Sequence, residues 1–247
     1  FIARDRLGIK PLYYHIGENK VLTFSSELRA MLGSGNVKRK LDENSLVDYL
    51  RYQTVYAPNT IVENVKMLLP GHYLFADLNG IEIKKYWDLN EKYDNKVADQ
   101  SYSEICKHTR RLLLNAVERR LISDVPFGAF LSGGIDSSAI VGLMSEVMSK
   151  SPDTFSVTFD EEEFSEAKYA QMVAKKFNTR HHEIKLKVAD FIGELPSALH
   201  AIDFPSGDGP NTYIVSKATK EAGITMALSG LGGDELFAGY EVFTRTD

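Results

Sequence analysis

The sequence predicts a parallel α/β domain with helices on both faces of its sheet, preceded by a truncated β-rich domain of the α+β class. In the first third of the chain, short apolar runs alternate with turns, which is typical of antiparallel strands. Beyond residue 100, short apolar strands alternate with helices, which indicates a parallel sheet. Two glycine-rich segments, 132–134 and 229–235, directly follow two of these strands. Because parallel sheets bind ligands beyond the carboxyl ends of their strands, these segments are the first candidates for a site.

The β-rich part is expected to span residues 1–90. Apolar residues recur there with a period of two between glycine, asparagine and proline residues. The predicted strands cover residues 12–15, 21–24, 73–76 and 81–83, with a helix over 44–52. The chain opens without methionine in what resembles the tail of a strand, so we expect the end of a larger domain. The polar segment 91–100 is the predicted linker.

The α/β part is expected to span residues 101–247 and to be truncated at its C-terminus. The predicted helices cover 103–121, 137–148, 166–177, 190–202 and 211–222. The predicted strands cover 127–131, 154–159, 181–186 and 224–228. Gly223 is the expected C-cap of the helix before the last strand. Since the chain stops at Asp247, soon after a glycine-rich loop, we expect no closing element there.

Composition argues against several classes of function. The formal net charge is −5 over 247 residues and no long basic run occurs, which argues against nucleic acid as a partner. No apolar run approaches the roughly 18 residues that a membrane span needs, and the first residues lack the layout of a signal peptide. The lone Cys106 cannot form an internal disulfide, which fits a reducing compartment. We therefore expect a cytoplasmic protein with small-molecule partners.

One strand-to-helix turn has the layout of a phosphate-binding loop. The glycines at 133 and 134 let the backbone approach a ligand, and the first free N–H groups of the following helix attract an anion. The hydroxyls of Ser132, Ser137 and Ser138 add donors. An ordinary turn would look the same in isolation. However, neither G-x-x-x-x-G-K-[ST] nor G-x-G-x-x-G occurs in the chain, so the commoner phosphate loops do not compete.

A carboxylate in this turn predicts a metal ion. Asp136 would repel a bare phosphate group unless a divalent cation joined the two, and magnesium is the usual cation there. The second glycine-rich loop, 229–235, follows another apolar strand of the same domain. It could place Asp234 opposite Asp136 across one magnesium ion.

The residues around both loops resemble the glutamine-dependent asparagine synthetases. Residues 125–138 resemble the pyrophosphate loop of that family, and residues 229–240 resemble its second ATP loop. Shorter matches follow in order at 154–157, 182–183, 203–205 and 211–213. Residues 4–14 with 24–27 resemble the later part of its glutaminase domain. The resemblance covers essentially the whole chain.

The resemblance implies a fold for each part. The α/β part would have the ATP-pyrophosphatase fold, which is similar to that of the adenine nucleotide α-hydrolases. The β-rich part would be the end of a class II amidotransferase domain of the N-terminal nucleophile type.

The resemblance also implies a reaction. In that family a carboxylate attacks the α-phosphate of ATP, which gives an acyl-adenylate and pyrophosphate. Ammonia from glutamine then displaces AMP. The charge that develops in the first step needs fixed donors and a cation, which here implies ATP and Mg²⁺. The expected product is asparagine, formed from aspartate through β-aspartyl-AMP, and a homodimer is left open as the assembly.

By resemblance, specific residues acquire roles. The ATP contacts are Leu131, Ser132, Gly133, Gly134, Asp136, Ser137, Ser138, Val157, Ser229 and Gly230. The metal ligands are Asp136 and Asp234, and the acid substrate contacts are Asp203, Asp208 and Thr212. For Leu131 and Val157, a place in the sheet core explains the residue equally well. For the three substrate contacts, a solvated loop rich in proline and glycine would look the same.

The chain departs from the family in its catalytic residues. The nucleophilic cysteine of the glutaminase domain and a lysine of the C-terminal part lie outside this sequence, so no catalytic residue is assigned and the chain alone is expected to be inactive. Cys106 is expected to be a buried thiol in a helix. His181 and His182 lack ligand-spaced partners, so we expect satisfied histidines rather than a metal site.

Leu231 bears on the identity of the acid. Asparagine-forming members of the family often carry an acidic residue between the two glycines that flank Leu231. An aliphatic side chain cannot accept the hydrogen bonds of an acid. Two alternatives therefore stay open: a related amidotransferase that adenylates another carboxylate in cell-surface or secondary metabolism, and a non-catalytic nucleotide-binding module.

Overall fold

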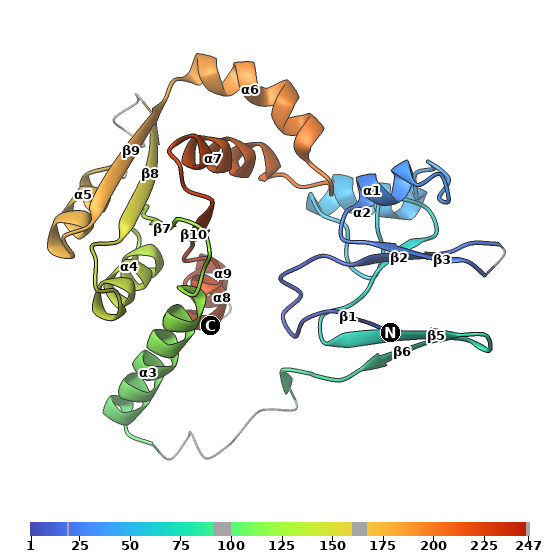
Figure 1. The fold of residues 1–247 in the computed structure, drawn as a ribbon, viewed down its shortest axis with the longest axis horizontal. Coiled ribbons are helices and arrows are strands. Elements are labelled where there is room, and N and C mark those ends of the chain that lie inside the picture. The colour runs from blue at the N-terminus through green and yellow to red at the C-terminus, as the bar shows by residue number, and fades with distance from the viewer. Residues whose placement is uncertain (19, 91–99, 160–166, 246–247) are drawn as a thin grey trace. The chain divides into compact units, whose positions relative to one another are not determined.

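The computed structural model divides into two compact units (Figure 1). It describes residues 1–18, 20–90, 100–159 and 167–245. The first unit comprises Phe1–Asn95 with Ser197–Pro210, and the second comprises Lys96–Pro196 with Asn211–Asp247. Of the predicted linker, residues 91–99 lie outside the described residues. Among the described residues, no helix has both the length and the apolar character needed to cross a membrane.

The first unit contains two antiparallel sheets of three strands. One sheet has the order β1-β5-β6 and the other β3-β2-β4. The strands are β1 (Ile2–Ala3), β2 (Tyr13–Ile16), β3 (Leu22–Ser25), β4 (Val65–Met67), β5 (His72–Asp77) and β6 (Gly80–Lys85). The helices are α1 (Leu28–Gly33) and α2 (Glu43–Tyr52). The predicted antiparallel strands are thus present, whereas the structure adds α1 and β4.

Residues 197–210 pack within the first unit, although the sequence placed them in the α/β part. Phe204 lies against the core cluster of this unit, which includes Tyr13, Leu28 and Met31. The carboxylate of Asp203 accepts the N–H groups of Leu28 and Arg29 at 2.7 and 2.8 Å. Asp203 therefore satisfies free donors at the start of α1.

The second unit is built on a parallel sheet with the order β10-β7-β8-β9. The strands are β7 (Phe127–Phe130), β8 (Asp153–Phe159), β9 (Arg180–Leu186) and β10 (Met226–Leu228). The helices are α3 (Tyr102–Arg120), α4 (Ile135–Val147), α5 (Ala167–Lys176), α6 (Val188–Ala201), α7 (Gly209–Glu221), α8 (Gly233–Phe237) and α9 (Glu241–Thr244). The end of α6, from Ser197, and the first two residues of α7 belong to the first unit. Figure 1 shows α4 and α5 on one side of the sheet and α7 on the other. The predicted fold class is confirmed.

The core of the second unit explains why α4 forms where it does. Ser137, Val141 and Met144 recur at helical spacing on α4, and all three are buried. Val141 and Met144 pack with Ala129 and Leu131 at the end of β7, which are also buried. The core therefore fixes the position of the helix that follows the first glycine-rich turn.

One expectation about this unit was wrong, because Cys106 is exposed rather than buried. Cys106 lies on the side of α3 that borders an open apolar groove against α4, so the helical pattern placed the residue on the wrong part of the helix. The structure also adds two short helices that were not predicted, α8, which begins inside the second glycine-rich loop, and α9.

Candidate active site

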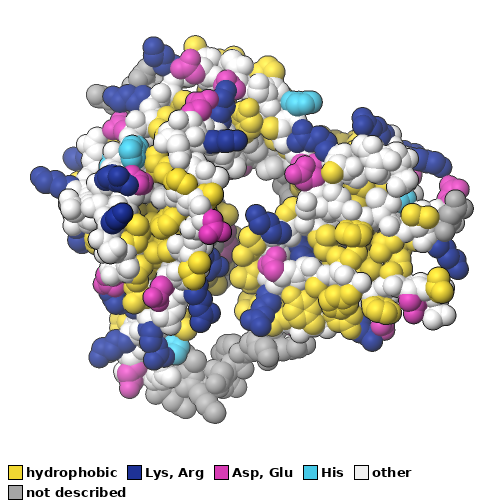
Figure 2. Space-filling model, in the orientation of Figure 1, with side chains coloured by type: hydrophobic (Ala, Val, Ile, Leu, Met, Phe, Trp, Pro, Cys, Tyr) yellow, Lys and Arg dark blue, Asp and Glu magenta, His cyan; other side chains and the backbone are white. Residues whose placement is uncertain are grey.

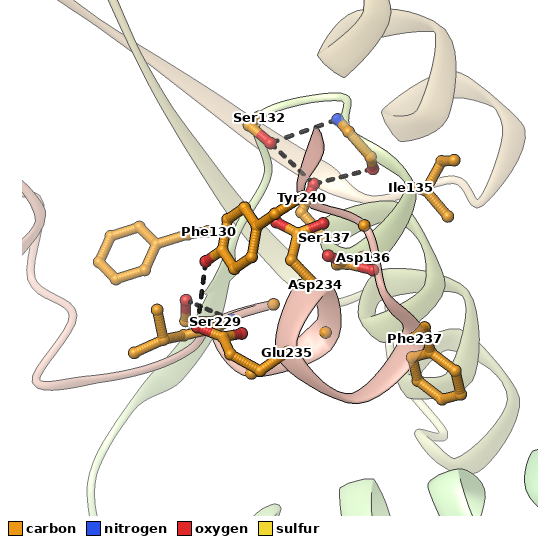
Figure 3. Close-up of a pocket in the computed structure, with 16 residues that line it drawn as sticks. Phe130, Ser132, Ile135, Asp136, Ser137, Ser229, Asp234, Glu235, Phe237 and Tyr240 are labelled. Atoms are coloured by element: carbon orange, nitrogen blue, oxygen red, sulfur yellow. Dashed lines mark hydrogen bonds between the residues drawn. The ribbon is translucent and has the colours of Figure 1, made fainter. Parts of the chain in front are cut away.

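The two glycine-rich loops border one cavity of about 570 Å³ (Figure 3). The first loop follows β7 and the second follows β10, and these strands are parallel neighbours in which Leu228 pairs with Ala129. Both loops therefore leave the sheet at the same edge. The predicted residues that line the cavity are Ser132, Gly134, Asp136, Ser137, Ser229, Gly230 and Asp234. The structure thus brings together most of the predicted nucleotide and metal residues.

The first loop is shaped by glycine and held by hydroxyl groups. Gly133 has a φ of 91°, and an added Cβ would lie 2.5 Å from Cβ of Tyr169, so only glycine fits. The N–H of Gly134 donates to Ser132 Oγ at 3.2 Å, and the Oγ atoms of Ser132 and Ser137 lie 3.0 Å apart. The hydroxyl of Ser138 donates to the carbonyl oxygen of Gly134 at 2.7 Å. Gly134 is the N-cap of α4, whose first N–H groups face the loop.

The second loop packs directly on the first. A Cβ added at Gly230 would lie 2.9 Å from both Cβ of Asp136 and the backbone nitrogen of Ser137. A Cβ added at Gly233 would overlap the carboxylate of Asp136. In Figure 3 the side chains of Asp136 and Asp234 lie between the two loops. The absence of side chains at these glycines is therefore what allows the two aspartates to share one cavity.

The cavity is rich in carboxylates. Asp136, Asp234 and Glu235 line it, and no lysine or arginine is found among its lining residues in the described part of the chain. Glu235 accepts a hydrogen bond from the hydroxyl of Tyr240 at 3.0 Å. This hydrogen bond, followed by partial desolvation and the nearby carboxylates, raises the pKa of Tyr240 above its ordinary value. A polyphosphate could enter such a cavity only together with a cation.

The residues present fit a magnesium ion that is shared with a phosphate ligand. Within the described residues, no three His, Cys, Asp or Glu side chains gather in a metal-binding arrangement. Magnesium is usually held by one or two carboxylates together with substrate phosphates and waters, rather than by an all-protein cage. Asp136 and Asp234 supply two such carboxylates.

The remaining predicted ATP contacts lie beside the main cavity. Leu131 and Val157 line a smaller cavity of about 180 Å³, which shares Phe130 and Ser132 with the main cavity. Leu131 is only 1% exposed, so its side chain belongs to the sheet core. Ser138 borders the apolar groove between α3 and α4.

The predicted substrate contacts do not line the main cavity. Asp203 and Asp208 belong to the first unit, where Asp203 binds the start of α1. Thr212 lies near the start of α7 in the second unit. Their contact with an acid substrate stays a prediction.

Sequence reasoning assigned no role to several residues that line the cavity. These residues include Phe130, Ile135, Phe237, Gly239 and Tyr240. Tyr240 and Phe237 follow the second loop within the segment that resembles the family motif, which is a signal that could have identified them.

The two neighbouring histidines have protein partners. His181 lies within hydrogen-bonding distance of Thr154 Oγ1 and Ser156 Oγ, at 3.0 and 3.2 Å. The ring of His182 stacks on Phe155. The expectation of satisfied histidines is confirmed.

Together, the parallel sheet and the glycine-lined carboxylate cavity define an α/β protein suited to binding a phosphate ligand with a cation. The model of the asparagine synthase family matches residues 108–247, and that of a glutamine amidotransferase domain matches residues 1–87. The chain therefore belongs to the asparagine synthase family.

Three curated relatives match almost the whole chain. It is 38% identical over 250 residues to putative asparagine synthetase [glutamine-hydrolyzing] 2 of Methanocaldococcus jannaschii, covering 97% of this chain and 47% of the relative. It is 35% identical over 244 residues to asparagine synthetase [glutamine-hydrolyzing] 1 of Bacillus subtilis, covering 98% of this chain and 37% of that relative. It is 33% identical over 261 residues to amidase chyE of Penicillium rubens, covering 98% of this chain and 38% of that relative. The chain spans less than half the length of each relative.

Proposed function

We propose that this chain carries the acid-activating part of a glutamine-hydrolysing asparagine synthetase. The carboxylate of the aspartate side chain attacks the α-phosphorus of ATP, which forms β-aspartyl-AMP as pyrophosphate leaves. Ammonia released from glutamine then attacks the activated carbonyl carbon, which forms asparagine as AMP leaves. The observation that carries the proposal is the convergence of the two glycine-rich loops, each with an aspartate, on one cavity. The names of two relatives agree with it.

The first loop binds the pyrophosphate portion of ATP in this proposal. The free N–H groups at the start of α4, a helix of 13 residues, point toward an anion and are aided by the helix dipole. The hydroxyls of Ser132 and Ser137 lie at the same end of the helix, where Ser137 donates to the carbonyl oxygen of Gly134 at 3.1 Å, and both turn from their protein partners to donate to the phosphate oxygens when the nucleotide binds. Gly133 and Ser138 keep the loop in shape, the former by its positive φ and the latter by its bond to Gly134. These donors oppose the charge of the departing pyrophosphate.

The adenosine portion lies in the smaller cavity. This cavity shares Phe130 and Ser132 with the main one, so a single nucleotide can extend across both. Leu131 and Val157 border the nucleoside, and Ser229 and Gly230 contact the nucleotide from the second loop. The buried side chain of Leu131 leaves its backbone as the part that faces the ligand.

Asp136 and Asp234 hold a magnesium ion in this proposal. The ion neutralises phosphate charge as the bond between the α- and β-phosphates breaks. Both aspartates are half-buried, and within the described residues neither side chain accepts a hydrogen bond. Their oxygens are therefore free to bind a cation.

The acid substrate lies near the second loop, with Thr212 of the second unit as a proposed contact. Both oxygens of Asp203 already accept N–H groups of Leu28 and Arg29, so contact of Asp203 with the acid stays a prediction from the resemblance, as does that of Asp208. The partners in this account are ATP, the acid and ammonia, without nucleic acid or membrane, and the protein is cytoplasmic. A homodimer is left open. Leu231 is 88% exposed and lines the cavity, so a different carboxylic acid is the alternative substrate.

The test measures pyrophosphate release by the full-length protein with ATP, Mg²⁺, glutamine and a panel of carboxylic acids. We expect release that depends on aspartate, together with asparagine as the amide product. Release with another acid alone would replace aspartate as the substrate and keep the adenylation chemistry. Binding of ATP without pyrophosphate release for any acid would instead indicate a non-catalytic nucleotide-binding module.

A further inference from the structure

The cavity carboxylates are not equivalent. Glu235 accepts the hydroxyl hydrogen of Tyr240 at 3.0 Å. Within the described residues, no donor reaches the side chains of Asp136 and Asp234, which line the same cavity. One carboxylate of the three is therefore fixed by a protein donor, while the other two keep their oxygens for a cation.

The hydrogen bond from Tyr240 closes a tight turn that also carries Asp234. The C-cap of the helix α8 is Ala238, which has a left-handed φ of 55°. The N–H of Gly239 then donates to the carbonyl oxygen of Asp234 at 2.9 Å. A Cβ added at Gly239 would overlap Oδ1 of Asp234, so this carboxylate lies directly against the turn. A change in the turn would therefore displace Asp234.

The ring of Tyr240 is held from the other side. Tyr240 is the N-cap of α9, and its ring stacks on that of Phe243 with centroids 6.4 Å apart and planes at 22°. From this position the hydroxyl reaches back to the residue that follows Asp234 (Figure 3). The phenol thus connects the start of α9 to the start of α8 across the turn.

We propose that Tyr240 is a positioning residue for the divalent cation. Its hydroxyl holds the Glu235 carboxylate and, through it, the turn that directs Asp234 toward Asp136. Tyr240 acts through Glu235 and contacts neither the cation nor the reacting atoms. The inference rests on the proposed function, because the cation belongs to the ATP-dependent step.

The test compares Tyr240→Phe with the wild type in the full-length protein. This substitution removes the hydroxyl and keeps the ring. Mn²⁺ binding is measured by electron paramagnetic resonance in the presence of α,β-methylene-ATP, which cannot release pyrophosphate. We expect binding to weaken roughly tenfold, the usual effect of losing a residue that orients a metal ligand. The Mg²⁺ concentration for half-maximal pyrophosphate release should rise in parallel, with little change in kcat at saturating Mg²⁺.

Two further variants separate positioning from a general effect on folding. Tyr52→Phe is the matched control, because Tyr52 is an exposed tyrosine of the first unit that does not line the cavity, and its hydroxyl makes no hydrogen bond within the described residues. It should leave Mn²⁺ binding unchanged. In a Glu235→Ala background, Tyr240→Phe should cause no further loss, because the acceptor of its hydrogen bond is already absent.

The failures of the inference and of the proposed function can be told apart. If Tyr240→Phe binds Mn²⁺ as tightly as the wild type, and the wild type releases pyrophosphate, the positioning role is wrong and the function stands. The role is also wrong if the double variant loses as much Mn²⁺ affinity as Tyr240→Phe and Glu235→Ala lose together. If the wild type neither binds the Mn²⁺ and nucleotide pair nor releases pyrophosphate, both are wrong.

Discussion

At the scale of single residues, glycine decides whether the two loops can meet. Gly230 lies so close to Asp136 and Ser137 that a methyl group there would press on the backbone of the first loop. Backbone at the start of α4 cannot yield easily, because Val141 and Met144 of the same helix are fully buried. The position of the second loop therefore depends on the missing side chain of Gly230.

Gly230→Ala should lower activity without unfolding the protein. The added methyl group displaces the second loop from the first, and such misplacement lowers kcat/KM by about 10- to 100-fold. Acid-dependent pyrophosphate release by the full-length protein measures the loss.

The matched control is Gly193→Ala. Gly193 lies inside α6 with no atom near its missing Cβ, so alanine should preserve activity and stabilise the helix. Equal activity in Gly230→Ala and the wild type would contradict the close contact of the loops.

The residues found from the sequence are those with local signatures. Ser132, Gly134 and Asp136 could be predicted because a strand end, a glycine turn and a helix start follow one another directly. Tyr240 could not be predicted as part of the site, because its contact with Glu235 depends on the left-handed backbone conformation of Ala238. A sequence pattern gives no direct indication of that conformation for alanine.

At the scale of elements, β8 and β9 share a polar layer. Thr154, Ser156 and Thr158 are buried along β8, and each lies within hydrogen-bonding distance of a side chain from β9. His181 lies between Thr154 and Ser156. Burial lowers the pKa of His181 below its ordinary value, so the folded protein favours the neutral ring.

The stability of the second unit should therefore fall at acid pH. Because the folded pKa of His181 is lowered, the unfolded chain binds the proton first as pH falls through about 6.5. The stabilisation that the neutral ring provides is fully present above that pH. It is lost as the pH falls toward the pKa that His181 has in the folded protein. Urea unfolding of the full-length protein between pH 8 and pH 5 measures the decline.

His181→Gln should reduce the pH dependence, since glutamine keeps hydrogen-bonding groups and does not titrate in this range. His108→Gln on the exposed surface of α3 is the control and should unfold with the pH dependence of the wild type. If His181→Gln and the wild type lose the same stability over this range, His181 is not the titrating group.

Elements with a clear period could be predicted, and the shortest ones could not. The helix α4 was expected over 137–148 and is observed at Ile135–Val147, because its apolar residues repeat over three turns. The helices α1, α8 and α9 contain six, five and four residues, too few to display a helical period. The adjacency of β7 and β10 depends on tertiary pairing between strands far apart in the sequence.

At the scale of the whole molecule, the two units are not consecutive in the sequence. Residues 197–210 belong to the first unit by their contacts, although the family model that covers them is that of asparagine synthase. A single boundary near the linker could be expected from the change in composition, but this return of the chain could not. It depends on particular contacts, such as those of Asp203 with α1 and of Phe204 with the core.

The surface of the first unit also carries apolar side chains. Figure 2 shows them on the face over β2, β3, β5 and β6. Ile16, Phe24, Phe75 and Ile83 are among the exposed large apolar residues of these strands. An apolar face of this kind is typical of surfaces that pack against other protein.

The most direct test of the account is the exchange of labelled pyrophosphate into ATP, measured on the full-length protein with Mg²⁺ and aspartate. Adenylation is reversible before ammonia arrives, so we expect exchange that requires the acid. We expect Asp136→Asn to abolish it, because an amide cannot replace the carboxylate as a magnesium ligand with charge. Undiminished exchange in Asp136→Asn, or no exchange by the wild type with any acid, would contradict an adenylation site between the two loops.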